Sequence, residues 1–374
     1  LMQPAADPAR QYLAKRGSSS EAITPVAIGY APTGWDNVLK RFGGNQENRQ
    51  SLIDAGMLVT NDQGRSYDRF RERVMFPIRD KRGRVIGFGG RVLGDALPKY
   101  LNSPETDIFH KGRQLYGLYE AQQDNPEPPR LLVVEGYMDV VALAQYDINY
   151  AVASLGTSTT ADHIQLLFRV TNNVICCYDG DRAGRDAAWR ALETARPYMT
   201  DGRQLRFMFL PDGEDPDTLV RKEGKAAFEA RMEQAQPLST FLFNSLLPQV
   251  DLSTPDGRAQ LSTLALPLIT QVPGETLRIY LRQELGNKLG ILDDAQLERL
   301  MPKQAENGAP RPAPQLKRTT MRILIGLLVQ NPDLAPLVPP LEGLDSRKMP
   351  GLSLFSELVK SCLAQPGLTT GQLL

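Results

Sequence analysis

Between residues 130 and 146 the chain reads RLLVVEGYMDVVALAQY, and this stretch decides the fold. Its short apolar run ends in Glu135 and Gly136, and an amphipathic stretch follows directly. A buried strand followed by a helix is the unit of a parallel sheet covered by helices, because both faces of such a sheet are buried. Residues 173–190, NVICCYDGDRAGRDAAWR, repeat the pattern and place Asp179 and Asp181 after a second apolar run.

The same alternation of short apolar runs and amphipathic stretches extends from residue 131 to about residue 210. It indicates strands and helices in turn. We expect strands at 130–135, 150–155, 173–179 and 204–210, and helices at 137–146, 160–170 and 182–199. The sequence therefore predicts an α/β domain at 129–211 with a parallel sheet and flanking helices.

The flanking segments have different patterns. Residues 1–128 contain short helical pieces and a hairpin, and they predict a mixed α+β subdomain. Residues 212–303 are nearly all helical in pattern and predict a bundle, with its clearest helices at 225–235, 240–247 and 275–289. Residues 304–317 are rich in Pro and polar residues and predict a linker. Residues 318–374 predict part of another helical module. Because the chain starts at Leu1 on what reads as the end of a linker, we expect a fragment of a longer protein.

Composition excludes several classes of protein. Hydrophobic residues make up 41% and charged residues 23% of the 374 positions, which are ordinary globular values. No apolar run approaches the roughly 18 residues that cross a bilayer, so we expect a cytosolic protein.

The adjacent Cys176 and Cys177 suit buried thiols, and a zinc site is excluded by the lack of a CxxC motif and by two widely separated histidines. Of these histidines, His163 is expected on the surface of its helix.

Charge is distributed unevenly although the 43 Lys and Arg balance the 43 Asp and Glu. Residues 65–99 hold ten Lys or Arg against four Asp or Glu. Apolar and basic residues alternate there around the turn at 80–83, which predicts a hairpin with one wet, cationic face. Because aromatic residues are interleaved with the arginines, we interpret this face as a groove for a nucleic-acid backbone.

The acidic residues predict a second kind of site. Glu135, Asp179 and Asp181 follow apolar runs, and the carboxyl ends of parallel strands meet at one edge of a sheet, where ligands bind. Each carboxylate alone is more simply a helix cap. Together they would repel each other without a cation, and a divalent ion such as Mg²⁺ resolves that conflict. For Asp215 and Asp217 a metal site and a plain helix start both remain open.

The segments VVEGYMDVVAL (133–143) and CCYDGDRAGRDAA (176–188) resemble the Toprim fold, which bacterial primases share with topoisomerases and some nucleases. Two upstream segments, at 69–93 and 98–118, resemble the polymerase domain of bacterial DnaG-type primases in particular. The resemblance covers roughly residues 7–300. It implies the catalytic acids Glu135, Asp179 and Asp181, and it implies further metal-site acids at Asp139, Asp215 and Asp217.

The resemblance also implies positions that handle nucleotide or template and a basic groove. The former are Lys99, Asn102 and Lys111, and the groove holds Arg69, Arg71, Arg73 and Arg91. It implies Mg²⁺ as cofactor, with Mn²⁺ able to substitute and no zinc in this fragment. The implied function is synthesis of short RNA primers from NTPs on single-stranded DNA, giving an RNA–DNA hybrid, at bacterial replication forks in the cytoplasm. The implied partner of the C-terminal region is the replicative helicase, and that region is expected to be incomplete here.

Two alternatives remain at this point. A topoisomerase would share the Toprim unit but needs a tyrosine nucleophile, and it would relax DNA through a covalent tyrosyl adduct. A non-catalytic DNA-binding or helicase-adaptor module could keep an empty acidic site, and its NTP binding would not respond to Mg²⁺ or Mn²⁺.

Overall fold

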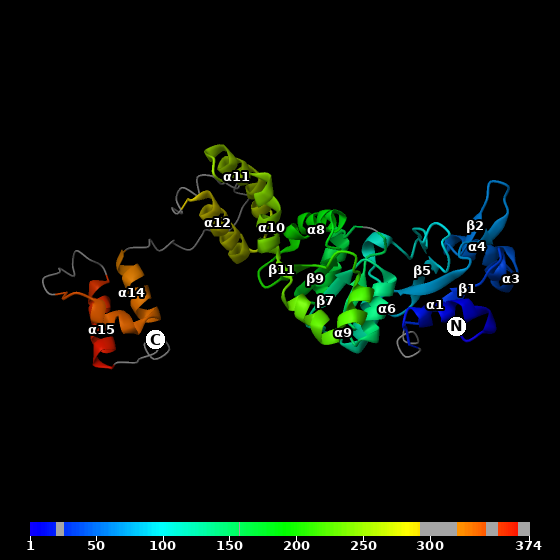
Figure 1. Cartoon of the computed structure of the whole chain (residues 1–374), viewed down its shortest axis with the longest axis horizontal. Coiled ribbons are helices and arrows are strands. Elements are labelled where there is room, and N and C mark those ends of the chain that lie inside the picture. Colours follow the sequence, from blue (N-terminus) through cyan, green and yellow to red (C-terminus); the bar gives the residue numbers. More distant parts are fainter. Residues whose placement is uncertain (20–25, 157, 292–319, 342–350, 366–374) are drawn as a thin grey trace. The chain divides into compact units, whose positions relative to one another are not determined.

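The structure is a computed structural model that describes residues 1–19, 26–156, 158–291, 320–341 and 351–365 (Figure 1). The chain forms two compact units, residues 1–302 and 303–374. The predicted linker at 304–317 lies outside the described residues.

A five-stranded sheet carries the first unit. Its strand order is β11-β10-β9-β7-β8, with β8, β7, β9 and β10 parallel and β11 antiparallel at the edge. The strands are β7 (Leu131–Val134), β8 (Ala151–Ala153), β9 (Asn173–Tyr178), β10 (Gln204–Phe209) and β11 (Gln236–Pro237). The predicted parallel sheet is confirmed, and the four predicted strands differ from the observed ones by one or two residues at their ends.

Helices cover both faces of this sheet. They are α5 (Leu118–Asp124), α6 (Tyr137–Gln145), α7 (Ala161–Val170), α8 (Arg182–Ala195), η3 (Arg196–Tyr198) and α9 (Pro216–Glu233). Apolar residues of α7 and α8 share one core cluster, whereas those of α6 and α9 share the other. Successive strand residues point to opposite faces, so Cys176 is buried in the first cluster and Cys177 in the second. Both are free thiols, as predicted.

Helix α9 packs against α6, so it belongs to the layer over the sheet and not to the bundle that we expected to begin at residue 212. It is kinked at Gly224, whose φ of +79° is left-handed, and the helix predicted at 225–235 corresponds to the part after the kink. After α9, the described chain continues in α10 (Leu238–Leu246), η4 (Leu247–Gln249), α11 (Pro255–Thr270) and α12 (Glu275–Leu289).

The N-terminal part is built on an antiparallel sheet of order β1-β4-β5-β6, with β2 and β3 paired beside it. Its strands are β1 (Gly29–Ala31), β2 (Leu58–Thr60), β3 (Ser66–Asp68), β4 (Arg73–Arg79), β5 (Val85–Val92) and β6 (Tyr100–Asn102). Its helical segments are η1 (Pro4–Ala6), α1 (Asp7–Lys15), α3 (Asn37–Phe42), α4 (Gln46–Asp54) and η2 (Lys111–Arg113).

Strands β4 and β5 form the predicted hairpin, but the prediction of a wet cationic face along it is wrong. Six of the seven residues of β4 are buried, and Arg73 and Arg91 are themselves only 7% and 6% exposed. Arg73 donates hydrogen bonds to the carbonyl oxygens of Gly90, Pro98 and Lys99. The guanidinium of Arg91 lies 4.7 Å from the ring centroid of Tyr12. Backbone carbonyls therefore hold Arg73 inside the protein, and the ring of Tyr12 lies against Arg91, whose buried Nε has no hydrogen-bond partner.

Tyr137, at the start of α6, joins the N-terminal sheet to the parallel sheet. Its ring stacks on Phe76 of β4, with centroids 5.3 Å apart. A Cβ atom on Gly89 would lie 2.3 Å from that ring, so only glycine permits this approach of β5. The Tyr137 hydroxyl donates a hydrogen bond to the side chain of Asn102. Tyr137 lies two residues after Glu135. Its contacts therefore set the position of the N-terminal sheet relative to the end of the parallel sheet at which Glu135 lies.

The second unit has a small core of its own. Its described helices are α14 (Thr320–Gln330), η5 (Pro332–Leu337) and α15 (Leu352–Ala364). Met321, Leu328 and Phe355 are buried together among them. Across the described parts of both units, no helix is both long enough and apolar enough to span a bilayer.

Candidate active site

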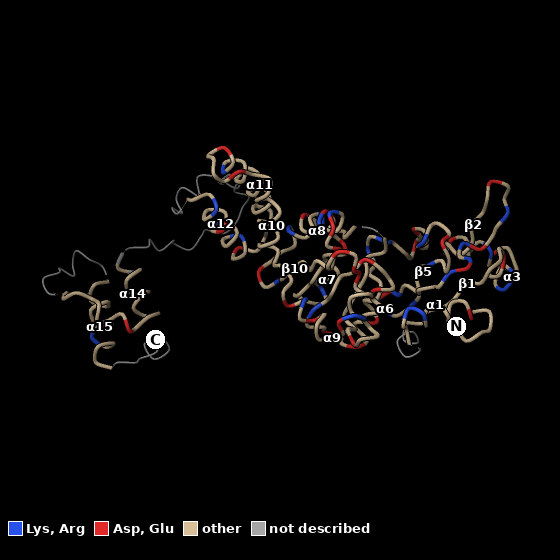
Figure 2. The backbone as a smooth tube through the Cα atoms, viewed as in Figure 1, with Lys and Arg blue, Asp and Glu red and all other residues tan. Residues whose placement is uncertain are grey.

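Three strand ends bring acidic residues to one edge of the parallel sheet. Glu135 follows β7, Asp179 follows β9, and the acidic turn at 212–217 follows β10. These three strands are neighbours in the sheet, with Val133 paired to Cys176 and Cys176 paired to Phe207. Figure 2 shows acidic segments in red beside α8. The expected gathering of carboxylates at this edge is therefore present.

Two glycines allow the backbone to turn tightly between these acids. A Cβ atom on Gly180 would lie 2.2 Å from the carbonyl oxygen of Leu210, and one on Gly184 would lie 2.1 Å from that of Asp179. Asp181 is the N-cap of α8 and accepts a hydrogen bond of 2.8 Å from the backbone amide of Gly184. One oxygen of Asp181 is thus used as a cap, as the simpler interpretation of this residue requires.

Glu135 and Asp179 are held near like charges. Desolvation raises the pKa of Glu135, and the charges of Asp179 and Asp181 raise it further. Desolvation also raises the pKa of Asp179, with further contributions from Asp181 and Asp215. Within the described residues, neither carboxylate has a Lys, Arg or His partner. Ionised, unpaired carboxylates that repel one another are the donor set that a hard divalent cation stabilises.

Asp139, Asp215 and Asp217 form a second acidic group beside the first. Asp139 accepts a hydrogen bond from the backbone amide of Gly136, and Asp215 caps α9 by accepting one from the amide of Thr218. Asp217 is only 1% exposed, and its carboxylate contacts the guanidinium groups of Arg16 at 3.1 Å and Arg221 at 2.6 Å. The resemblance implied that Asp217 faces a metal ion. In the structure its carboxylate instead forms ion pairs with these two arginines.

The acidic edge, without a bound ion, does not present a complete set of protein ligands for a metal. Among the residues that the structure describes, no group of three or more His, Cys, Asp or Glu side chains is arranged to hold a metal. Mg²⁺ commonly uses one or two protein carboxylates and completes its shell with water and substrate phosphates. The donors at this edge fit such an ion.

Replacing Asp139 with Asn should change how stability depends on pH. Desolvation, followed by the charges of Asp215 and Asp217, raises the pKa of Asp139 to about 7. Since the unfolded value is near 3.8, the folded state holds the extra proton between these values, and its stability falls as pH rises from about 4 to 7. We expect the variant to exceed the parent by about 1–3 kcal/mol in unfolding free energy at pH 8, without divalent metal.

Urea unfolding at pH 5 and pH 8 measures this effect. The difference between variant and parent should shrink markedly at pH 5, because Asp139 is then protonated in the folded state. An equal difference at both values of pH would show that the carboxyl of Asp139 titrates normally.

The residues expected to handle nucleotide or template are placed in different surroundings. Lys99 is exposed and Lys111 is half-buried. Asn102 links the two sheets: its amide donates to the carbonyl of Leu155 at 2.8 Å, and its side-chain oxygen accepts from Tyr137. Asn102 thus has a structural contact on each side, in addition to any contact with a ligand.

Two half-buried cations of the expected groove, Arg69 and Arg71, lie beside a tryptophan. A pocket of about 350 Å³ is lined by Trp35, Arg69 and Arg71, among others. The Arg71 guanidinium lies 3.9 Å from the ring centroid of Trp35, which is 61% exposed. Arg69 donates to the backbone carbonyl of Asn102. Trp35 was missed in the sequence because it stands alone, 30 residues before the basic segment, and carries no motif.

Comparison with known proteins identifies four family matches. Residues 1–122 match the N-terminal domain of the DNA primase catalytic core, and 132–220 match a Toprim-like family. Residues 239–294 match the DnaB-helicase binding domain of primase, and 321–374 match the DnaB-binding family of the primase DnaG.

Curated proteins and solved structures are similar over long spans. The DNA primase of Escherichia coli K12 is 88% identical over the whole chain, and that of Haemophilus influenzae is 57% identical over 98% of it. The chain spans 64% and 62% of their lengths. A structure of the DnaG primase catalytic domain bound to single-stranded DNA is 89% identical, with a TM-score of 0.77, covering 79% of this chain and 93% of that one. A DNA primase domain from Pseudomonas aeruginosa is 54% identical, with a TM-score of 0.76, over 79% of this chain and 93% of that chain.

Proposed function

Because the chain belongs to the family of bacterial DnaG-type DNA primases, we propose that it synthesises short RNA primers on single-stranded DNA. The observation that carries the proposal is the unpaired acidic edge, where Glu135 and Asp179 follow neighbouring strands and the charge of Asp179 raises the pKa of Glu135. The Toprim-like match implies divalent-metal binding at such an edge. The primase-specific matches on either side of it favour this function over a topoisomerase.

We assign the roles of the acids from their surroundings. Glu135, Asp179 and Asp181 would hold Mg²⁺, or Mn²⁺ in its place, with Asp139 and Asp215 behind them. Asp217 would fix α1 to α9 through Arg16 and Arg221. Bound Mg²⁺ would neutralise charge on the NTP phosphates. In the reaction, the 3′-oxygen of one nucleotide bonds to the α-phosphorus of the next NTP as the bond to pyrophosphate breaks.

The template would lie against the half-buried arginines and the exposed tryptophan of the N-terminal part. Arg69, Arg71 and Trp35 offer two guanidinium groups and an open aromatic face, the combination that binds single strands through phosphates and bases. Lys99 is exposed beside this surface. Arg73 and Arg91 would support it from inside through their carbonyl and ring contacts. An RNA–DNA hybrid would form between this surface and the acids.

We further propose that the C-terminal helices contact the replicative helicase and that the protein acts in the cytoplasm at replication forks. The family matches at 239–294 and 321–374 support the helicase contact. In the second unit, α14 and η5 leave an apolar pocket of about 320 Å³ lined by Leu324, Leu327 and Leu337. Such a surface is suited to a protein partner.

The direct test is primer synthesis from labelled NTPs on a single-stranded template, with and without divalent metal. We expect short RNA products only when Mg²⁺ or Mn²⁺ is present. Metal-independent products, or DNA relaxation with a tyrosyl adduct, would contradict the proposal.

Replacing Arg71 with Ala tests the template surface separately. The loss of one phosphate contact should weaken binding of an oligo-dT strand about threefold to tenfold. It should also lower the salt dependence of log K by about 0.7. Fluorescence anisotropy at several salt concentrations measures both quantities. Arg169→Ala is the control, because Arg169 is exposed on α7 and has no ion-pair partner within the described residues. Equal binding by the two variants would remove Arg71 from the template surface.

A further inference from the structure

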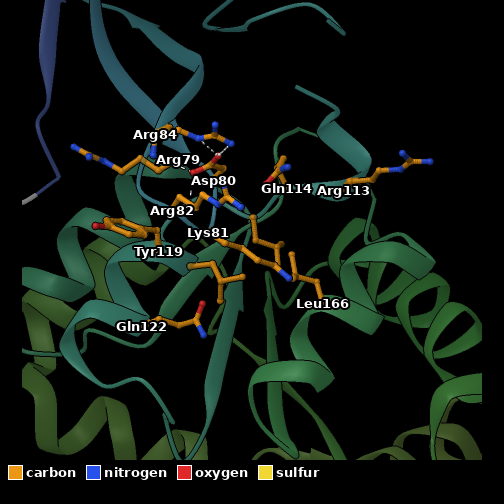
Figure 3. A pocket seen from close by; sticks show the side chains of 12 residues that line it. Arg79, Asp80, Lys81, Arg82, Arg84, Arg113, Gln114, Tyr119, Gln122 and Leu166 are labelled. Carbon is orange, nitrogen blue, oxygen red and sulfur yellow. Dashed lines mark hydrogen bonds and ion pairs between the residues drawn. The ribbon is translucent and has the colours of Figure 1, made fainter. Parts of the chain in front are cut away.

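A second cationic pocket lies at the other end of the β4–β5 hairpin. It has a volume of about 410 Å³ and is lined by Arg79, Asp80, Lys81, Arg82, Arg84, Arg113, Gln114, Leu115, Leu118, Tyr119, Gln122 and Leu166. Five of these side chains are cationic and one is a carboxylate. In Figure 3 the hairpin turn with Lys81 and Arg82 lies above Gln122 and Leu166, and Tyr119 lies beside the turn.

This pocket is distinct from the proposed template surface. Arg73, at the start of β4, lies beside that surface, whereas Arg79 ends the strand at the hairpin turn. A strand of seven residues separates its ends by about 20 Å. The pocket therefore needs its own explanation.

Three of the five cations are already paired. Arg79 lies 3.2 Å from Glu120, Arg84 lies 2.7 Å from Asp80, and Arg113 lies 3.2 Å from Asp162. Figure 3 also shows the side chain of Arg113 pointing away from the other labelled groups. Lys81 and Arg82 are exposed, and no acidic partner for either is found within the described residues. The uncompensated positive charge of the pocket thus resides on two adjacent turn residues.

The turn that presents Lys81 and Arg82 is fixed in shape. The Asp80 carboxylate accepts hydrogen bonds from the backbone amides of Arg82 at 2.9 Å and Arg84 at 3.0 Å. Gly83 has a φ of +78°, and a Cβ atom there would lie 2.6 Å from the ring of Tyr119. The turn therefore rests on Tyr119, and the backbone that carries the two cations is ordered before a ligand binds, so only their side chains lose conformational freedom on binding.

The lining also indicates the class of ligand. Lys81 and Arg82 suit a phosphate group, since ammonium and guanidinium groups are its usual donors. Leu118 and Leu166 supply an apolar wall, and the amides of Gln114 and Gln122 can both donate and accept hydrogen bonds. The carboxylates of an acidic peptide would use only the cations of this pocket. A nucleotide uses all three kinds of surface, and about 400 Å³ lies within the usual range for a small-molecule site.

We propose that this hairpin-tip pocket binds the phosphate of a nucleotide, with Lys81 and Arg82 as its donors. The phosphate comes either from a free nucleotide or from the backbone of a single strand that extends past the template surface. Binding here requires neither metal nor catalysis. The proposal is therefore independent of primer synthesis.

The test uses the whole chain without divalent metal and the double variant Lys81→Ala/Arg82→Ala. The control is Arg190→Ala/Lys360→Ala, which removes the same charge from exposed residues of α8 and α15. Anisotropy of a labelled 20-nucleotide oligo-dT and calorimetry with ATP form the two arms. We expect the hairpin variant to bind one of these probes about fivefold more weakly, and for oligo-dT the salt slope should fall by about 1.4.

Weakened oligo-dT binding with unchanged ATP binding assigns the phosphate to a nucleic-acid strand, and the reverse assigns it to a free nucleotide. Either result supports the site. Hydrogen exchange gives a second measurement, since the bound probe should protect segments 79–84 and 113–122 in the parent protein. The proposal is overturned if both probes bind the hairpin variant and the control equally.

Discussion

Asp179→Ala is expected to lower primer synthesis by about a thousandfold or more while the fold stays intact. Asp179 follows β9 at the centre of the acidic edge, and no cation among the described residues pairs with it. Its removal would take away a carboxylate that binds metal. The same change should not destabilise the protein, because the pKa of Asp179 is raised by desolvation and by Asp181 and Asp215. A carboxyl group whose pKa is higher in the folded than in the unfolded chain lowers the free energy of unfolding when it is ionised.

Primer assays and urea unfolding of the same preparation separate these two effects. Asp186→Ala is a suitable control, since Asp186 is exposed on α8 and its carboxylate has no ion-pair partner in the described part of the chain. We expect the control to retain the activity of the parent. Substantial synthesis by the Asp179 variant would remove this residue from the catalytic acids.

Asp217→Asn should give the largest loss of stability, about 2–4 kcal/mol in unfolding free energy. Its carboxylate is buried between Arg16 of the N-terminal part and Arg221 of α9. Replacing it leaves two guanidinium groups near each other without an anion. Because about a third of each arginine side chain is exposed, water recovers part of the cost, and the expected loss is smaller than the roughly 3–5 kcal/mol for a fully buried pair.

Urea unfolding at pH 7 measures this loss, with Asp212→Asn as the control. Asp212 is exposed in the same acidic turn, and we expect its replacement to change stability by less than about 0.5 kcal/mol. If the Asp217 variant were as stable as the control, the ion-pair cluster would not hold α1 to α9.

The elements predicted well from the sequence are those with a local cause. Strand β9 has a continuous apolar run bounded by polar residues, and α12 was predicted at 275–289, where the structure has Glu275–Leu289. The carboxylates at the strand ends follow from the topology alone, since neighbouring parallel strands must end on one edge. The family resemblance then indicated that Glu135, Asp179 and Asp181 are the catalytic acids.

The failures have non-local causes. The arginines at 73 and 91 looked like surface cations, but carbonyls from the chain near Pro98 and the ring of Tyr12 surround them. His163 is also buried, contrary to the expectation, because its ring nitrogen lies 2.9 Å from the backbone carbonyls of Lys111 and Gln114. One of the two arginine partners of Asp217, Arg16, stands 201 residues away in the sequence. No local pattern reveals partners at such separations.

Manganese binding at the acidic edge tests the central claim most directly. Electron paramagnetic resonance can count the Mn²⁺ bound by the parent chain and by Asp179→Asn, a variant that keeps the size of the side chain and removes its charge. We expect the parent to bind Mn²⁺ and the variant to lose most of that affinity. Equal Mn²⁺ binding by both proteins would mean that the carboxylates after β7 and β9 do not hold the ion.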